Sequence, residues 1–265
     1  MSAIRKVQFL NGCLLAWGVL ALLACQAQSA PAYLPAQIFA RGRKLTYLVS
    51  RVAAGSQQVQ PDTMVLTSFG LHQKHTVYDF PTGHTTLHME QINLGYSYGT
   101  HASVNSFSGV FEHDSLLWMH PPRNGAYAIL ELSPYPYIQL PARAGHQWTW
   151  DLEVGDNWSN PQWATWRGLI RVRSQYKIMG QQELSTPLGL LRCWLVRAQT
   201  SSLVGSSVLA LWYHPAYGFV QMEYRDIKNN RLTFKLLSAS MERLPESPSE
   251  LQPYHFSLSK ESLNK

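Results

Sequence analysis

Short segments in which apolar and polar residues alternate fill the chain between Tyr33 and Met241. A period of two residues places successive side chains on opposite faces of a β-strand, so each segment predicts a strand with one buried face. The segments are rich in Val, Thr, Leu, Tyr and Trp and are bounded by Gly, Pro, Asn or Asp, as is typical of strands and their turns. The predicted strands cover residues 44–53, 63–69, 76–80, 84–90, 102–112, 115–119, 126–132, 147–152, 163–179, 190–200, 208–213, 219–225 and 232–240.

No helix is predicted in this region. No stretch repeats apolar residues at the helical period of 3.6 over three turns, and the chain's 17 glycines and 15 prolines interrupt it often. Asn229-Asn230 predicts a hairpin turn, because asparagine tolerates a positive φ. Residues 133–145 hold three prolines among aromatic and apolar residues, which predicts an edge strand passing between two halves. We therefore expect an all-β domain built as a single curved antiparallel sheet, a half-barrel or a sandwich.

The N-terminus has the features of an export signal. Arg5 and Lys6 precede an apolar stretch of 12 residues, Cys13–Ala24. A bilayer-spanning helix needs about 20 apolar residues, so this stretch fits the core of a signal peptide better than a membrane span. It ends in Leu-Leu-Ala followed by Cys25, which resembles the bacterial lipobox. The resemblance implies that Cys25 is lipidated on its sulfur and becomes the first residue of the mature protein.

The alternative to a lipoprotein signal is an ordinary signal peptide cleaved after Ala27 or Ala30. With a lipidated Cys25, the chain divides into four parts. Gln26 stands where an aspartate would retain such a lipoprotein in the inner membrane, so the resemblance implies the outer membrane. The expected parts are a signal peptide over residues 1–24, a tether over 25–35, an all-β domain over 36–244 and a disordered tail over 245–265.

Composition and charge exclude several classes of protein. Charged residues make up 14% of the chain and hydrophobic residues 45%, which excludes a highly charged disordered chain and allows a sizeable core. Without Arg5 and Lys6, the formal net charge falls from +6 to +4, from 20 basic and 16 acidic residues. Because the chain has no long basic run and carries an export signal, we expect no nucleic-acid partner. Cys193 then remains as the one thiol, and its strand pattern predicts a buried side chain rather than a nucleophile.

The second half resembles a known group of proteins through three motifs that occur in order. They are Leu140-Pro141 with Gly145-x-x-Trp148, Thr186-Pro187-Leu188-Gly189, and Trp212-Tyr213-His214-Pro215-Ala216-Tyr217-Gly218-Phe219-Val220. These motifs resemble a family of exported bacterial β-rich proteins of unknown function, whose last hairpin carries a Trp-Tyr-x-Pro-x-x-Gly-x-Val signature. The resemblance covers about residues 140–241. It implies an envelope location and a curved β domain, and it brings no catalytic residues.

No motif specifies a metal, a cofactor or a catalytic residue. The sequence lacks Gly-x-Ser-x-Gly, His-Glu-x-x-His and a glycine-rich phosphate loop. His84 and His88 would share one strand face about 13 Å apart, which is too far for two ligands of one zinc ion. His113 and His120 match no metal signature, so we expect surface or hydrogen-bonded histidines. The sequence therefore predicts no metal site and no cofactor.

Five tryptophans within 19 residues form the most informative cluster. Trp148 and Trp150 share one face of a predicted strand, which we expect to be buried. Trp158 lies in a polar segment with turn residues on both sides, and Trp163 and Trp166 fall on opposite faces if their strand is regular. Aromatic rings can stack on sugars or wall an apolar cavity. Trp158, Trp163 and Trp166 are therefore the candidate ligand-binding residues.

Three functions are compatible with these features. The leading hypothesis is a non-enzymatic cell-envelope protein, held at the membrane by its lipid anchor, that binds an apolar or glycan ligand or a partner protein. An envelope-polymer hydrolase would use carboxylates near the tryptophans, such as Asp151 and Glu153, and a structural accessory subunit of an envelope assembly is the third hypothesis. A large apolar cavity would favour the first, a cleft between carboxylates the second, and a flat apolar patch the third. The sequence does not decide the oligomeric state.

Overall fold

The computed structural model describes residues 37–71, 77–82, 85–99 and 104–244, and for residues 77–82 and 85–87 it describes the backbone alone. The predicted signal peptide, tether and tail lie outside these ranges, as do Cys25 and His84. Neither of the two short helices in the described ranges is long and apolar enough to cross a membrane.

Fourteen strands and two 3-10 helices make up the described part of the chain. They are β1 (Arg43–Val52), β2 (Gln60–Leu71), β3 (Val77–Thr82), β4 (Thr85–Glu90), β5 (Ile92–Tyr98), β6 (Ser106–His113), β7 (Leu116–Met119), η1 (Gly125–Leu132), β8 (Tyr137–Gln139), β9 (Gln147–Val154), η2 (Asp156–Trp158), β10 (Ile170–Thr186), β11 (Gly189–Ser202), β12 (Gly205–His214), β13 (Gly218–Arg225) and β14 (Arg231–Met241).

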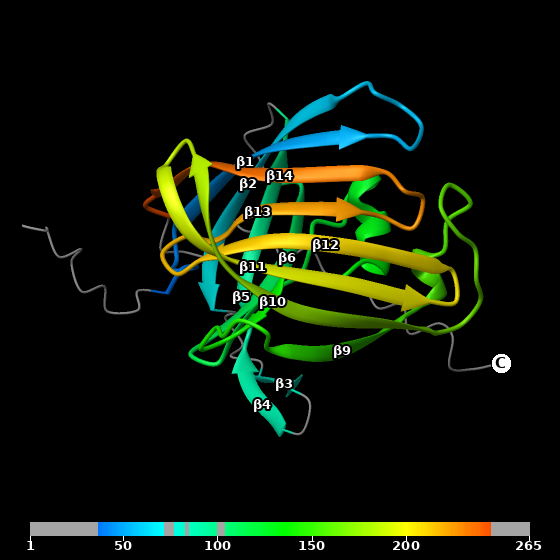
Figure 1. Ribbon diagram of the computed structural model, residues 1–265, viewed down its shortest axis with the longest axis horizontal. Coiled ribbons are helices and arrows are strands. Elements are labelled where there is room, and N and C mark those ends of the chain that lie inside the picture. The colour runs from blue at the N-terminus through cyan, green and yellow to red at the C-terminus, as the bar shows by residue number, and fades with distance from the viewer. Residues whose placement is uncertain (1–36, 72–76, 83–84, 100–103, 245–265) are drawn as a thin grey trace, which may run out of the picture. The chain divides into compact units, whose positions relative to one another are not determined.

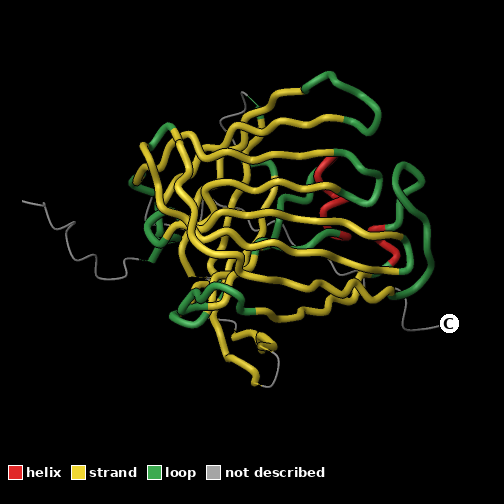
Figure 2. The backbone as a smooth tube through the Cα atoms, in the orientation of Figure 1, coloured by secondary structure: helices red, strands yellow, loops and turns green. Residues whose placement is uncertain are grey.

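Twelve strands form one antiparallel sheet in the order β8-β7-β6-β5-β2-β1-β14-β13-β12-β11-β10-β9 (Figure 1). Most neighbours in this order are consecutive in the chain, and the pairing of β1 with β14 joins the first half of the sheet to the second. β3 and β4 pair with each other as a separate hairpin. Strands dominate the backbone trace in Figure 2, and the prediction of an all-β half-barrel is confirmed.

The sheet curls because its two edge strands, β8 and β9, follow each other in the chain. Residues 140–146 join them, and an extended chain covers at most about 3.6 Å per residue, so the two edges must approach. Tyr137 of β8 and Trp148 of β9 meet with ring centroids 5.3 Å apart. The edge strand predicted within residues 133–145 is therefore confirmed as β8, and aromatic side chains join the two edges.

Side chains on one face of the sheet form the main core. In β10, buried and exposed residues alternate from Ile170 to Ile178, as the strand period requires. Cys193 is fully buried in the same core, as predicted. Burying a tyrosine hydroxyl without a partner is costly, and three of the buried phenols donate to backbone carbonyls. The carbonyl acceptors are Phe219 O for Tyr47 at 2.8 Å, Tyr135 O for Tyr176 at 3.0 Å and His120 O for Tyr96 at 2.9 Å.

Residues 126–132, predicted as a strand, instead belong to the 3-10 helix η1. Four consecutive residues from Ile129 to Leu132 are buried, which a strand with one solvent face could not achieve. The helix packs against the sheet: the Tyr127 ring lies 6.0 Å from that of Phe234, and Ser207 Oγ donates to Leu132 O at 3.0 Å. The run from Ile129 to Leu132 is buried at every position, so it does not follow the alternating burial of a strand.

The strand predicted over residues 163–179 begins later, at Ile170, and continues to Thr186. Residues 159–169 form a loop in which Asn160 bridges to Ala164 and Gly168 has a φ of 71°. Trp163 and Trp166 therefore do not lie on the faces of a strand. Their spacing of three residues does not fit a period of two, and the loop holds each ring by its own contacts.

Strand β5 is missing from the sequence-based prediction. Its residues include Gly95, and glycine lowers the strand preference of a short segment. A Cβ atom at Gly95 would lie 2.5 Å from the Phe69 ring and 2.9 Å from a methyl group of Val104. The neighbouring side chains therefore occupy the space that any larger residue would need, which makes this glycine a packing requirement.

Two predicted turns are confirmed. Asn229 has a φ of 61°, and Gly218, directly after the turn that begins at Pro215, has a φ of 73°. A Cβ atom at Gly218 would also lie 3.1 Å from Ile38 Cγ2. The prolyl and glycyl residues of the Trp-Tyr-x-Pro-x-x-Gly-x-Val motif thus act as a structural signature.

Gly218→Val is expected to lower the free energy of unfolding by about 1–3 kcal/mol, because a β-branched residue is strained at positive φ. Urea denaturation of the variant and the wild type measures the difference. Gly218→Asn is the matched control, because asparagine tolerates this φ, and it should lose less stability than the valine variant. Equal stability of the valine variant and the wild type would contradict the account of this turn.

Candidate ligand-binding site

A pocket of about 490 Å³ lies where β9 approaches β6, β7 and η1. Its walls combine aromatic rings with several charged side chains. The lining residues are Gln91, Phe111, Trp118, His120, Arg123, Glu131, Tyr135, Trp150, Asp151, Leu152, Glu153, Val154 and Trp158. The volume falls within the range of about 300–1,000 Å³ that is usual for sites of small ligands.

The aromatic wall comes from both edges of the sheet. Trp118 of β7 and Trp150 of β9 meet edge to face with centroids 5.6 Å apart. Tyr135 lies 5.1 Å from Trp150 and 5.5 Å from Trp118, and Phe111 lies 5.4 Å from Trp118. Such tilted arrangements are favoured by the charge distribution of aromatic rings, and they hold each ring in place. The wall is therefore assembled by the curl of the sheet.

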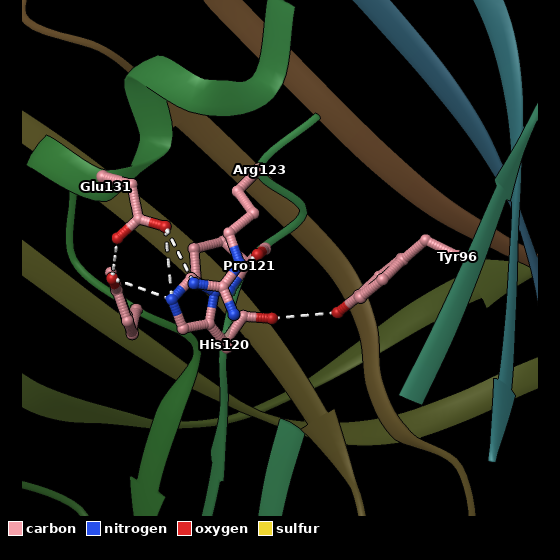
Figure 3. A network of polar contacts seen from close by, with 6 residues as sticks. Tyr96, His120, Pro121, Arg123 and Glu131 are labelled. Carbon is pink, nitrogen blue, oxygen red and sulfur yellow. Dashed lines mark hydrogen bonds and ion pairs between the residues drawn. The ribbon is translucent and has the colours of Figure 1, made fainter. Parts of the chain in front are cut away.

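Glu131 is the centre of a buried polar network (Figure 3). The helix η1 carries this side chain into the pocket wall, where only 4% of the residue is exposed. Tyr135 Oη donates to one carboxylate oxygen, and His120 Nε2 lies 3.2 Å from the other. Arg123 Nη1 lies 3.9 Å from that second oxygen. A buried carboxylate needs such partners because an isolated charge is very costly to remove from water.

The contacts of His120 explain how the network is oriented. Its Nδ1 lies 2.8 Å from the Pro121 carbonyl oxygen, which only accepts hydrogen bonds, so Nδ1 carries a proton. Its Nε2 faces the Glu131 carboxylate at 3.2 Å and also lies 3.1 Å from Tyr135 Oη, so the ring links both members of the network. The His120 carbonyl accepts from Tyr96 Oη at 2.9 Å, which fixes the backbone on the other side (Figure 3).

Neighbouring positive charges and hydrogen-bond donors favour the ionised forms of Glu131 and Asp151. Burial by itself raises the pKa of Glu131, but hydrogen bonds and positive charge from His120, the Tyr135 hydroxyl and Arg123 outweigh it and hold the pKa below its ordinary value. The hydrogen bond from Arg171 likewise lowers the pKa of the Asp151 carboxyl. Neither carboxyl is therefore poised to donate a proton near neutral pH.

The three candidate tryptophans separate into two groups. Trp158 lines the pocket, and the Arg123 guanidinium lies 5.9 Å from the centre of its ring. Trp163 and Trp166 pack behind it in a smaller apolar cluster around Val154 and Ile170. Trp163 Nε1 donates to Trp158 O at 3.2 Å, so the loop supports the lining tryptophan. Ligand binding by these three residues stays a prediction.

The remaining residues singled out in the sequence, Trp148, Trp150 and Cys193, are part of the core. Trp148 and Trp150 are both buried, as expected for one core face, and Trp150 also lines the pocket. Burial raises the pKa of the Cys193 thiol to about 11, which suppresses the reactive thiolate. Within the described ranges, no three histidine, cysteine or acidic side chains lie close enough together to hold a metal ion.

Sequence reasoning missed most of the polar network. His120 was expected to be a hydrogen-bonded histidine, which it is, but Arg123, Glu131 and Tyr135 carried no recognised motif. One signal was available: Glu131 is the only charged residue in the apolar run from Ala126 to Leu132. A single acid within such a run indicates a buried carboxylate whose partners lie elsewhere in the chain.

Comparisons with known proteins give a distant likeness only. No family model and no curated protein matches the sequence. A protein with a YmcC-like fold from Bacteroides fragilis is 13% identical, with a TM-score of 0.44 over 76% of this chain and 96% of its own. The hypothetical lipoprotein YmcC from Escherichia coli is 11% identical, with a TM-score of 0.35 over 80% and 89%. A LolA superfamily protein from Nitrosomonas europaea is 9% identical, with a TM-score of 0.29 over 78% and 89%. At these scores the likeness carries no argument about function.

Proposed function

We propose that the protein is a lipid-anchored, non-enzymatic component of the bacterial cell envelope that binds a glycan ligand in the pocket between the sheet edges. One observation carries the proposal: Trp118, Trp150 and Trp158 line a pocket whose wall also presents the charged groups of Glu131 and Arg123. Aromatic faces stack on the apolar faces of sugar rings, and fixed polar groups bind the hydroxyls at the ring edges.

The polar lining favours a glycan over an acyl chain. An acyl chain would leave the charged and amide groups of the pocket without partners after water is expelled, and each unpaired group would cost free energy. A sugar offers hydroxyls that both donate and accept hydrogen bonds. Gln91, Asp151 and Glu153 provide matching groups around the rim. The pocket chemistry thus supports a glycan ligand over an apolar one.

The same carboxylates support a second candidate function, the hydrolysis of an envelope polymer. A glycoside hydrolase needs one protonated carboxylic acid beside one carboxylate. The lowered pKa values of Glu131 and Asp151 oppose the protonated form, which favours binding over hydrolysis. Release of reducing ends from N-acetylglucosamine oligomers during prolonged incubation would overturn the non-enzymatic proposal.

Binding is tested with tryptophan fluorescence, because three indoles line the pocket. N-acetylglucosamine tetramer and maltohexaose should change the emission in a saturable way, whereas laurate should not. Trp158→Ala should weaken saccharide binding by about 1–2 kcal/mol, which is roughly a 5- to 30-fold loss of affinity. Trp212→Ala, which removes a ring of β12 that does not line the pocket, is the matched control and should bind within about twofold of the wild type. Saturable binding of laurate alone would favour the apolar ligand instead.

The lipid anchor is tested at Cys25. Cys25→Ser should abolish lipidation, because only the thiol at this position can accept the lipid, and should leave the precursor uncleaved or the protein soluble. Fractionation of a Gram-negative host and mass spectrometry of the mature N-terminus measure both outcomes, and separation of inner from outer membranes tests the outer-membrane location. The same mature N-terminus and membrane partition for the serine variant would contradict a lipoprotein signal.

A further inference from the structure

The exposed face of the sheet carries a second concave region, separate from the ligand pocket. A hollow of about 820 Å³ extends over strands β10 to β14 and β1. Its lining includes four exposed cations, Lys177, Arg197, Arg225 and Arg231. Glu223 is the single carboxylate among the described residues that line it, and Glu223 accepts a hydrogen bond from Gln221 at 2.7 Å. The hollow, called here the basic groove, therefore has an excess of positive charge.

Strand register sets the four cations in two like-charged pairs. Lys177 of β10 stands directly opposite Arg197 of β11, and Arg225 of β13 stands opposite Arg231 of β14. Among the described residues, no carboxylate forms an ion pair with any of the four. Like charges placed directly opposite on neighbouring strands destabilise a sheet. Two such pairs in one hollow therefore form two sites where an anion would relieve repulsion.

Strand β12 separates the two pairs with apolar residues. Ala210 stands opposite Arg197 and Val208 stands opposite Arg225, so no charged side chain of β12 lies between the pairs. The nearest members of the pairs, Arg197 and Arg225, are two strands apart and offset by two residues along the strands, which corresponds to about 12 Å at the usual strand spacing and rise. Gln175 and Gln199 face each other in the same hollow and offer neutral amides that both donate and accept hydrogen bonds.

We propose that the basic groove binds a glycan chain that carries carboxylate or phosphate groups, with one anionic group at each cation pair. A chain crossing β12 would reach both pairs, and the neutral amides would bind its hydroxyls. A flat bilayer surface fits the floor of a hollow poorly. An acidic peptide could not extend the sheet here, because the groove lies on a face and not at an edge. The site is independent of the tryptophan-lined pocket.

The test measures binding of a polygalacturonate oligomer to the full chain by calorimetry in low-salt buffer. The variants are Lys177→Gln/Arg197→Gln and Arg225→Gln/Arg231→Gln. Each should weaken binding by about tenfold or more, and added salt should weaken binding by the wild type. Arg192→Gln/Lys235→Gln is the matched control, because it removes the same charge from exposed strand positions that do not line the groove. The control should bind within about twofold of the wild type.

Other ligands test whether the groove is selective for an anionic glycan. Neutral dextran should not bind, and poly-L-glutamate and phosphatidylglycerol vesicles should bind more weakly than the anionic glycan. Trp158→Ala should leave polygalacturonate binding unchanged, so failure of the ligand pocket and failure of the groove are distinguishable. Equal loss in the control variant, or equal or tighter binding of the polypeptide or the vesicles, would overturn the proposal. Thermal melts should show both groove variants folded, with unchanged or raised Tm because repulsion is removed.

Discussion

Glu131→Leu is expected to lower the free energy of unfolding by about 3–5 kcal/mol at neutral pH, because removing one partner of a buried charge network leaves the others uncompensated. Tyr135 Oη would lose its acceptor, and His120 and Arg123 would face an apolar side chain. Chemical denaturation measures the loss. Glu131→Gln preserves the shape and some hydrogen bonding, so its loss should be smaller.

A double-variant cycle identifies the cause. His120→Leu should cost clearly less in the Glu131→Leu background than in the wild type, because its partner is already gone. Additive losses would show that the two side chains stabilise the protein separately. A Glu131→Leu protein within about 1 kcal/mol of the wild type at neutral pH would contradict the network as a source of stability.

The network also predicts a pH dependence. The pKa of Glu131 in the folded protein lies below its ordinary value of 4.5 in the unfolded chain. A lowered pKa means that the carboxylate form stabilises the fold, so its contribution is complete above pH 4.5 and is lost as the pH falls through the folded-state pKa. The stability difference between the wild type and Glu131→Gln should therefore shrink as the pH drops below this value. If the stability difference between the wild type and Glu131→Gln grew as the pH fell, the carboxylate form of Glu131 would not be the form that stabilises the fold.

Trp148→Ala is expected to lower the free energy of unfolding by about 3–5 kcal/mol, because it leaves a cavity between the edges of the sheet. The indole stacks on Tyr176 with centroids 5.1 Å apart and planes 4° apart, and it also meets Tyr137 of β8. Denaturant melts give the size of the loss. Trp148→Phe keeps an aromatic ring and should cost under about 1.5 kcal/mol.

Trp163→Ala provides the comparison within the tryptophan cluster. Its ring is only partly buried in the smaller apolar cluster, so its removal should cost less than removal of Trp148. If Trp163→Ala unfolded the protein while Trp148→Ala melted like the wild type, the sheet edges would be held together by the loop and not by the aromatic contacts.

Local patterns determined much of the fold. The alternation in β10, the positive φ of Gly218 and Asn229, and the burial of Cys193 are each indicated by the residue pattern of a single strand or turn. Such features need only neighbouring residues, because strand period and turn geometry are set by backbone sterics. The sequence by itself therefore predicted an all-β protein and most of its strands.

Tertiary structure alone decided the site. Glu131 meets His120 and Tyr135 because residues 126–132 form a helix, against their local pattern, whose end from Ile129 to Leu132 is buried. Trp118 meets Trp150 because the edges β8 and β9 approach, although β7 and β9 lie far apart in the order of the sheet. The pairing of like charges in the basic groove likewise depends on strand register. The local sequence around each of these residues does not predict its distant partner. Only burial and packing over the whole sheet bring the partners together.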